Sequence, residues 1–88
     1  MKVLFTDKAW EHYRWWATND VEILLRLNEL IESARRTPFQ GIGKPEPLKG
    51  DLRGFWARRI TEEHRLVYEV AGKGAAQTVT IVMCRYHY

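Results

Sequence analysis

Three side chains in this sequence have the chemistry that cleaving a phosphodiester bond requires: the carboxylate of Glu46, the guanidinium of Arg65 and the imidazole of His87. Cleavage of RNA without a metal needs a base for the 2′-OH proton, a cation beside the phosphorane oxygens and an acid for the leaving 5′-oxygen. A guanidinium matches phosphate oxygens in pairs, and an imidazole is protonated near neutral pH. The three residue types therefore fit the three roles in the order named.

Glu46 lies in a rigid and basic stretch of the chain. Pro45 and Pro47 flank it, and proline fixes its own φ and favours extended geometry in the residue before it. Lys44 and Lys49 are close in sequence, so the carboxylate is set among groups that attract anions. We expect the loop that carries Glu46 to meet the C-terminus, which ends with an arginine, a histidine and two tyrosines.

Each of these residues, taken alone, also has an ordinary structural interpretation. Glu46 would be a solvated loop acid, and His87–Tyr88 would be a frayed terminus. Arg65 would form an ion pair with Glu62 or Glu63 at the start of a strand. Only the chemical interpretation requires the three residues to lie around one site.

Metal and cofactor sites have little support in the sequence. The single cysteine and the three histidines show no HxH, HxxxH or CxxC spacing, and no glycine-rich phosphate loop opens a helix. We therefore predict neither a metal nor a cofactor. We interpret His12 as a helix-surface residue, His64 as a turn residue and Cys84 as a small buried hydrophobe.

Composition indicates a globular chain with an uneven distribution of charge. The 88 residues, 45% of them hydrophobic, suffice for one domain, 1–88, with a modest core. Residues 1–34 carry four Lys or Arg and six Asp or Glu, a net charge of −2, whereas residues 35–88 carry ten and five, a net charge of +5. The basic part favours an anionic partner, nucleic acid first. The alternative is that these side chains only solvate the surface.

Features that would direct the chain out of the cytoplasm are missing from the sequence. The one cysteine excludes an intrachain disulfide, and the chain starts with no signal-like segment. No apolar run approaches the length of a membrane span. These features predict a cytoplasmic protein that does not bind a membrane.

Two helices are predicted in the first half of the chain. Apolar residues recur at helical spacing between Thr6, a suitable N-cap, and Thr18. A second helix is capped by Asn19–Asp20 and shows an apolar stripe at i, i+4, i+7, i+8 and i+11. Pro38 should stop it near Arg36 or Thr37. The short link between the helices predicts an antiparallel hairpin.

Strands are predicted at Lys2–Phe5, Phe55–Thr61, Arg65–Val70 and Thr78–Tyr86. Residues 39–53 have no periodicity, and their glycines and prolines predict a loop of definite shape. The order β-α-α-β-β-β predicts an α+β fold, with the helical hairpin packed on one face of a mainly antiparallel sheet. We expect a ligand on the other face, in a groove between the Glu46 loop and the C-terminus.

Four stretches of this sequence closely resemble the YoeB toxins, which belong to the RelE/ParE superfamily of bacterial toxin–antitoxin systems. They are Arg35–Phe39, Gly43–Lys49, Gly54–Tyr68 and Cys84–Tyr88. The likeness extends over essentially the whole chain, and the longer stretches make it specific. It implies the RelE-like microbial RNase fold.

The resemblance also implies a function and partners. The implied activity is an endoribonuclease, an mRNA interferase that cuts messenger RNA in the ribosomal decoding site without a metal and so arrests translation. The implied partners are the ribosome with its mRNA and a YefM-like antitoxin, whose disordered tail folds onto the toxin and blocks the site. Toxins of this family are typically homodimers, so we expect a homodimer here.

The resemblance assigns roles to residues of this chain. It implies that Glu46 is the general base, Arg65 the phosphate-stabilising cation and His87 the general acid, and that Tyr88 shapes the pocket and contacts a base. Four basic residues are expected to hold the RNA backbone: Lys44, Lys49, Arg58 and Arg59.

Two other functions remain open at this point. The same superfamily contains ParE-type toxins that inhibit DNA gyrase by binding, without enzymatic activity, and such inhibitors have no need of Glu46, Arg65 and His87. A general basic RNA-binding module would bind RNA in a salt-sensitive way without cutting it. The turn Ala71–Gln77 is longer than is usual in the family, and we expect it to alter contacts with partners rather than chemistry.

Overall fold

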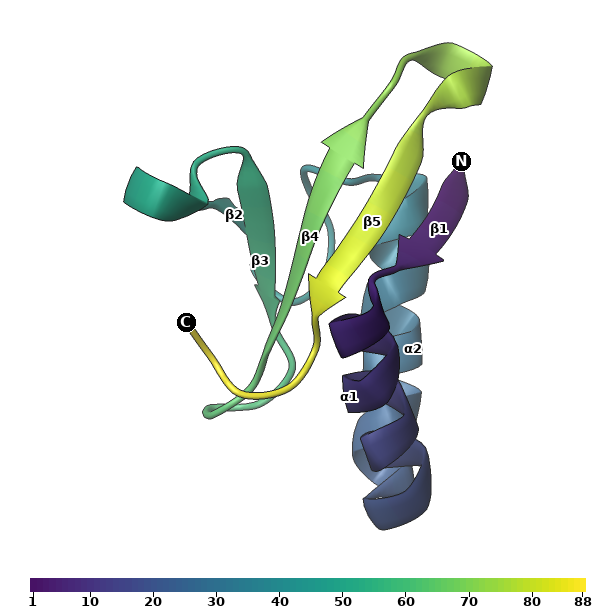
Figure 1. Ribbon diagram of the computed structural model, residues 1–88, viewed down its shortest axis with the longest axis vertical. Coiled ribbons are helices and arrows are strands. Elements are labelled where there is room, and N and C mark those ends of the chain that lie inside the picture. The colour runs from purple at the N-terminus through teal and green to yellow at the C-terminus, as the bar shows by residue number, and fades with distance from the viewer.

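Two helices form a hairpin on one side of a five-stranded sheet in the computed structural model, which describes residues 1–88 (Figure 1). The helices are α1 (Asp7–Asn19) and α2 (Val21–Arg36). The strands are β1 (Lys2–Phe5), β2 (Glu46–Pro47), β3 (Phe55–Arg59), β4 (Arg65–Ala71) and β5 (Thr78–Met83). Two single-turn 3₁₀ helices, Gly50–Leu52 and Gly74–Ala76, lie in the connections.

Both helices begin at the predicted caps. The Thr6 hydroxyl accepts a hydrogen bond from the Ala9 N–H (3.1 Å), and an Asp20 carboxylate oxygen accepts one from the Ile23 N–H (3.2 Å). Each bond satisfies a backbone donor that the first helical turn leaves free. Because Asp20 is the only residue between the two helices, α2 runs back along α1, as the short link predicted (Figure 1).

The sheet has the order β1-β5-β4-β3-β2. β1 pairs with β5 in parallel, and all the other neighbours pair antiparallel. This confirms the predicted α+β fold and its mainly antiparallel sheet. Three predictions about strands were wrong: β3 ends at Arg59 rather than Thr61, pairing of β5 ends at Met83 rather than Tyr86, and Glu46–Pro47, predicted as loop, forms the edge strand β2.

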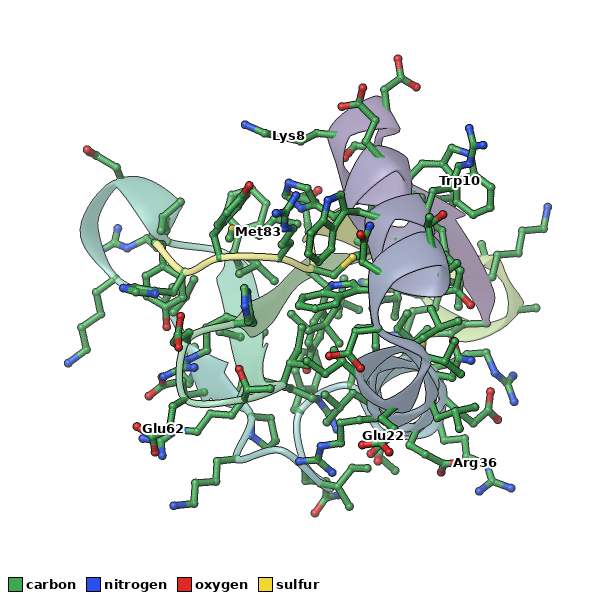
Figure 2. All side chains as sticks on the ribbon, turned by 90° about the horizontal axis from the view of Figure 1, so that it is seen from below. Lys8, Trp10, Glu22, Arg36, Glu62 and Met83 are labelled. Carbon is green, nitrogen blue, oxygen red and sulfur yellow. The ribbon has the colours of Figure 1, made fainter.

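The core lies between the helices and one face of the sheet, and Figure 2 shows both helices on the same side of the strands. Its buried hydrophobic residues come from both helices, from β4 and β5, and from positions just after β3 and β5: Ala9, Trp16, Leu27, Leu30, Ala34, Ile60, Leu66, Tyr68, Val79, Ile81 and Cys84. Because side chains alternate along a strand, the residues between these point to the opposite face. That face is free to carry a site.

Neither helix combines the length and the apolar character that a membrane crossing requires.

Candidate active site

The strand register places Glu46, Arg59 and Arg65 on the sheet face opposite the helices. Glu46 pairs with Ala57, and Ala57 pairs with Val67, so these three side chains share a face. Arg59 and Arg65 pair with each other two positions further along, and therefore point to that same face. The three charged residues come from three neighbouring strands, β2, β3 and β4.

Contacts on both sides of β2 fix the loop that carries Glu46. The Gly43 carbonyl accepts a hydrogen bond from the Arg59 N–H (2.7 Å), and the Leu48 N–H donates to the Phe55 carbonyl (2.9 Å). Gly43 has a φ of +81°, and a Cβ there would meet Leu30 of α2 at 2.5 Å. Glycine is therefore required at this point, where the loop passes against α2. The Glu46 side chain itself is exposed.

The last five residues, 84–88, form a C-terminal segment that leaves β5 and turns back toward β3 (Figure 1). Tyr86 adopts a left-handed conformation with a φ of +68°, and its carbonyl accepts from the Arg65 N–H (2.8 Å). The Tyr88 hydroxyl then reaches Glu46 and donates to its Oε1 at 3.4 Å. The Glu46 loop and the C-terminus meet as predicted, and the interpretation of the terminus as frayed is wrong.

Tyr88 and His87 have defined protonation at this site. Burial raises the pKa of Tyr88, and the neighbouring Glu46 charge raises it further, so the phenol keeps its proton and donates to the carboxylate. The His87 Nδ1 lies 3.0 Å from the Glu63 carbonyl. Since a carbonyl only accepts, Nδ1 carries the proton in this contact. Nε2 is then the nitrogen of His87 that is left to exchange a proton with a ligand.

Arg65 is anchored by one nitrogen of its guanidinium. Nη1 donates to the carbonyls of Thr61 (2.7 Å), Glu62 (3.1 Å) and His64 (3.1 Å). The expected alternative, an ion pair with Glu62 or Glu63, is wrong, because the ion pairs in the structure join Glu32 to arginines of α2. The carbonyls hold the guanidinium in place, and its Nε and Nη2 groups supply the planar fork that suits phosphate oxygens.

Beside these polar groups lies a cavity of about 420 Å³. Its lining is mainly apolar and aromatic: Lys8, His12, Leu52, Phe55, Val67, Val82, Met83, Tyr86, His87 and Tyr88. Lys8 extends from α1 on the side of the molecule where Met83 lies (Figure 2). Flat aromatic walls with a few polar groups at the rim are suited to stacking a nucleobase.

Three of the four basic residues expected to bind RNA are exposed: Lys44 and Lys49, which lie close to β2 in sequence, and Arg59, which shares a sheet face with Glu46. The expectation for Arg58 was wrong. Arg58 is fully buried and points toward α2, where its guanidinium donates to the Tyr68 hydroxyl (2.9 Å) and the Ser33 hydroxyl (2.7 Å). It also donates to the backbone carbonyls of Thr37, Gln40 and Ile42. Its donors are occupied, so it fixes the chain after α2 instead of contacting a phosphate.

The sequence did not predict the contacts that two histidines, His12 and His64, make with the C-terminal segment. His12, predicted on the helix surface, is buried, and its Nδ1 accepts from the Cys84 N–H (3.2 Å). His64 does lie in the turn before β4, and its Nδ1 accepts from the Tyr86 N–H (2.7 Å). One signal was available: His12 lies three residues after Ala9 and four before Trp16, which places it on the buried stripe of α1.

Cys84 is buried as predicted, and burial raises the pKa of its thiol to about 12. Its carbonyl accepts a hydrogen bond from the Trp16 indole N–H at 2.8 Å. The thiol therefore stays protonated at physiological pH, and Cys84 fixes the base of the C-terminal segment to α1.

Comparisons with known proteins agree with this architecture. Residues 5–88 match the family model for the YoeB-like toxin of bacterial type II toxin–antitoxin systems. Toxin YoeB of Escherichia coli K12 is 52% identical over 88 residues, which cover 100% of both chains. The structure of a YoeB/ParE toxin from Agrobacterium tumefaciens is 50% identical, covers 100% of both chains and superposes with a TM-score of 0.95.

Staphylococcus aureus YoeB has been solved as a dimer and in a YoeB–YefM complex. These structures are 40% and 39% identical to this chain, cover 100% of it and 98% of their own chains, and superpose with a TM-score of 0.87. The family model matches from Phe5 to Tyr88, and the relatives and solved structures named here cover the whole chain. The chain therefore belongs to the YoeB-like toxins of bacterial type II toxin–antitoxin systems.

Proposed function

We propose that this toxin is an endoribonuclease that cuts messenger RNA in the ribosomal decoding site and thereby stops translation. One observation carries the proposal: the C-terminal segment folds back so that the Tyr88 hydroxyl meets Glu46. Glu46, Arg59 and Arg65 share one sheet face, and His87 precedes Tyr88 and lines the same cavity. In this proposal a base, a cation and a proton donor from distant parts of the chain act on one phosphodiester group.

The proposed reaction starts at the ribose. Glu46 takes the proton of the 2′-OH, and the 2′-oxygen attacks the adjacent phosphorus. The Nε and Nη2 groups of Arg65 donate to the nonbridging oxygens as negative charge builds up on them. His87 delivers a proton from Nε2 to the leaving 5′-oxygen, and the bond from phosphorus to that oxygen breaks. The products are a 2′,3′-cyclic phosphate and a 5′-hydroxyl, and no step requires a metal.

The surroundings of the site support an RNA substrate. Arg59 is exposed on the sheet face of Glu46, Lys44 and Lys49 are exposed close to Glu46 in sequence, and all three are able to hold backbone phosphates. The apolar cavity next to Tyr88 is suited to one unstacked base. Dependence on the ribosome follows in this proposal from the family, and the toxin acts in the bacterial cytoplasm, where translation takes place.

The proposed partners come from the relatives. Because Staphylococcus aureus YoeB has been solved as a dimer and with YefM, we propose a homodimer and a YefM-like antitoxin for this chain. The antitoxin blocks the groove between the Glu46 loop and the C-terminal segment. No specific observation in the structure favours the alternative of a gyrase inhibitor.

The test is single-turnover cleavage of an mRNA on purified ribosomes. Glu46→Gln and His87→Gln should each lower the rate by roughly 10²–10⁴-fold, the usual cost of losing a catalytic acid or base. Glu69→Gln is the matched control, because Glu69 is an exposed carboxylate on the same sheet face, in β4. Unchanged rates in both site variants, or products that lack the cyclic phosphate, would overturn the proposal.

A further inference from the structure

The C-terminal segment is held by side chains after its strand pairing ends. β5 stops at Met83, and the peptide groups of Cys84 bond to α1 instead of β4. The Cys84 N–H donates to Nδ1 of His12 (3.2 Å), and the Cys84 carbonyl accepts from the Trp16 indole (2.8 Å). Two side chains of α1 thus hold the first residue of the segment from both sides.

Tyr86, two residues later, is held in the same way. Its N–H donates to Nδ1 of His64 (2.7 Å), and its carbonyl accepts from the Arg65 N–H (2.8 Å). The left-handed φ of +68° at Tyr86 is costly for a residue with a side chain, so it depends on such support. His87 and Tyr88 follow this turn, and the Tyr88 hydroxyl reaches Glu46.

Both supports require a neutral imidazole. A histidine nitrogen accepts a hydrogen bond only while it carries no proton, and a doubly protonated ring only donates. Acceptance at Nδ1 therefore fixes the tautomer of His12 and His64 with the proton on Nε2. Protonation would place an N–H of the ring opposite a backbone N–H and remove both bonds.

We propose that His12 and His64 are positioning residues that hold the C-terminal segment in place only while both rings are neutral, so that acid releases His87 and Tyr88 from the site. The release itself is a property of the fold. Its effect on cleavage rests on the proposed function.

The surroundings of His64 favour its neutral ring. Burial is the largest influence on the pKa of His64 and lowers it from its ordinary value of 6.5. The Trp16 and Tyr86 rings lie 4.8 and 6.2 Å from the imidazole, centroid to centroid. Four charged or titratable side chains from the preceding turn, β4 and the C-terminal segment act on it: Glu63, which raises the pKa, and Arg65, Arg85 and His87, which lower it.

His12 has a similar setting on α1. Burial is again the largest influence and lowers the pKa of His12 from 6.5. Lys8 and Arg85 lower it as well, whereas Glu11 raises it. The Tyr86 ring packs edge-on against the imidazole at 5.7 Å, and the Cys84 thiol next to it stays neutral. Both rings are therefore neutral at pH 7 and become protonated as the pH falls through their lowered pKa values.

Amide hydrogen exchange of the full-length protein, measured by NMR between pH 7.5 and 5, tests the release without any RNA. Exchange rates are corrected for the intrinsic effect of pH. The protection of the Cys84 and Tyr86 amides should fall by up to about tenfold for each pH unit below 6.5, the ordinary pKa that a released ring regains, until the pH reaches the lowered pKa of the held ring. The Thr6 amide, which donates to the Ile81 carbonyl (3.0 Å), is the internal control and should stay protected.

His64→Asn and His12→Asn separate positioning from simple packing. The Oδ1 atom of asparagine takes the place of Nδ1, accepts the same bond and does not titrate. Tyr86 should stay protected at pH 5 in His64→Asn while Cys84 still loses protection, and His12→Asn should show the reverse. His64→Ala should expose Tyr86 at every pH. The inference would be overturned if the wild-type Tyr86 and Cys84 amides stay protected at pH 5. It would also be overturned if each asparagine variant loses amide protection at pH 5 to the same extent as the wild type.

Cleavage assays over the same pH range test whether release of the C-terminal segment lowers the activity. His64→Asn should retain more of its pH 7.5 cleavage rate at pH 5.5 than the wild type does. An absence of cleavage at every pH would contradict the proposed function and leave the amide results to decide on the release. Amides that exchange as expected, with equal acid sensitivity of cleavage in both proteins, would refute the link between release and activity.

Discussion

Arg65 uses some atoms of its side chain for structural contacts and leaves others free for chemistry, as do other residues of this site. Its Nη1 bonds to three carbonyls of the preceding turn, which leaves one edge of the fork for a phosphate. His87 uses Nδ1 for the Glu63 carbonyl and leaves Nε2 for proton transfer. Tyr88 connects the end of the chain to Glu46. Each side chain is thus oriented by one contact and acts through another atom.

Arg65→Lys tests this division of work. A lysine ammonium that bonds to the turn carbonyls lacks a second, planar pair of donors for phosphate. Single-turnover cleavage should therefore fall by about 10²–10³-fold, as when one transition-state donor is removed. Arg53→Lys, at an exposed arginine that does not line the cavity, should leave the rate unchanged. A lysine variant as fast as the wild type would show that bidentate contact is unnecessary.

At the scale of elements, much of the fold followed from sequence pattern. The caps Thr6 and Asp20, the helical hairpin and the three long strands were predictable because each has a local signal. β2 was not, because a two-residue strand has no periodicity and exists only through its pairing with β3. The turn Ala71–Gln77 contains the 3₁₀ helix Gly74–Ala76 and lies at the far end of β4 and β5 from the C-terminal segment (Figure 1).

Only the part of the site that has a local signal in the sequence was predictable. Alternation along β3 places Arg58 on the face of Trp56 and Ile60, which the helices cover, and Arg59 on the other. The choice between the faces depends on where α2 ends, and no local pattern gives that. The contacts of His12 and His64 with the C-terminal segment span 72 and 22 residues, so spacing does not show them.

Arg58→Met tests the structural role of the buried arginine. The substitution removes a charge and leaves the carbonyls of Thr37, Gln40 and Ile42 without their donor. We expect the free energy of unfolding to fall by about 3–5 kcal/mol, measured by urea denaturation. Arg59→Met is the matched control, because Arg59 is the next residue in β3 and is exposed. This substitution should change the free energy of unfolding by no more than about 0.5 kcal/mol. Equal effects of the two substitutions would contradict the assignment.

For the whole molecule, stability should depend on pH through His12 and His64. Both have a pKa below the ordinary 6.5, so between pH 6.5 and their folded-state values the unfolded chain binds more protons. Their contribution is then complete above pH 6.5 and is lost as the pH falls through the lowered values. The Glu32 carboxyl, whose pKa lies below 4.5 because of a hydrogen bond from Arg35, contributes stability that is lost only when the pH falls below 4.5.

The free energy of unfolding, measured in urea from pH 8 to 5, should therefore decrease once the pH is below 6.5. The double variant His12→Asn, His64→Asn should flatten this decrease, because neither asparagine titrates. A stability that rises toward pH 5 would contradict the assigned direction of both pKa shifts.

The whole molecule also joins two oppositely charged parts of the chain. The first 34 residues, mostly helix, carry a net charge of −2, and the remaining 54 residues, which form the strands of the site, carry +5. The helices α1 and α2 each carry no net charge and lie on the covered face of the sheet (Figure 1), whereas the exposed Arg59 lies on the other face, in the part of the chain with the net charge of +5. This distribution of charge is suited to drawing an RNA strand to the groove face.

The most direct measurement of the central claim uses an mRNA in which the single ribose at the mapped cleavage site lacks its 2′-hydroxyl. If Glu46 activates that hydroxyl for attack, this message should remain uncut on purified ribosomes, while messages with the deoxyribose one position to either side are cut as usual. Cleavage of the site-deoxy message at the normal position and rate would show that the ribose is not the nucleophile and would contradict the proposed mechanism.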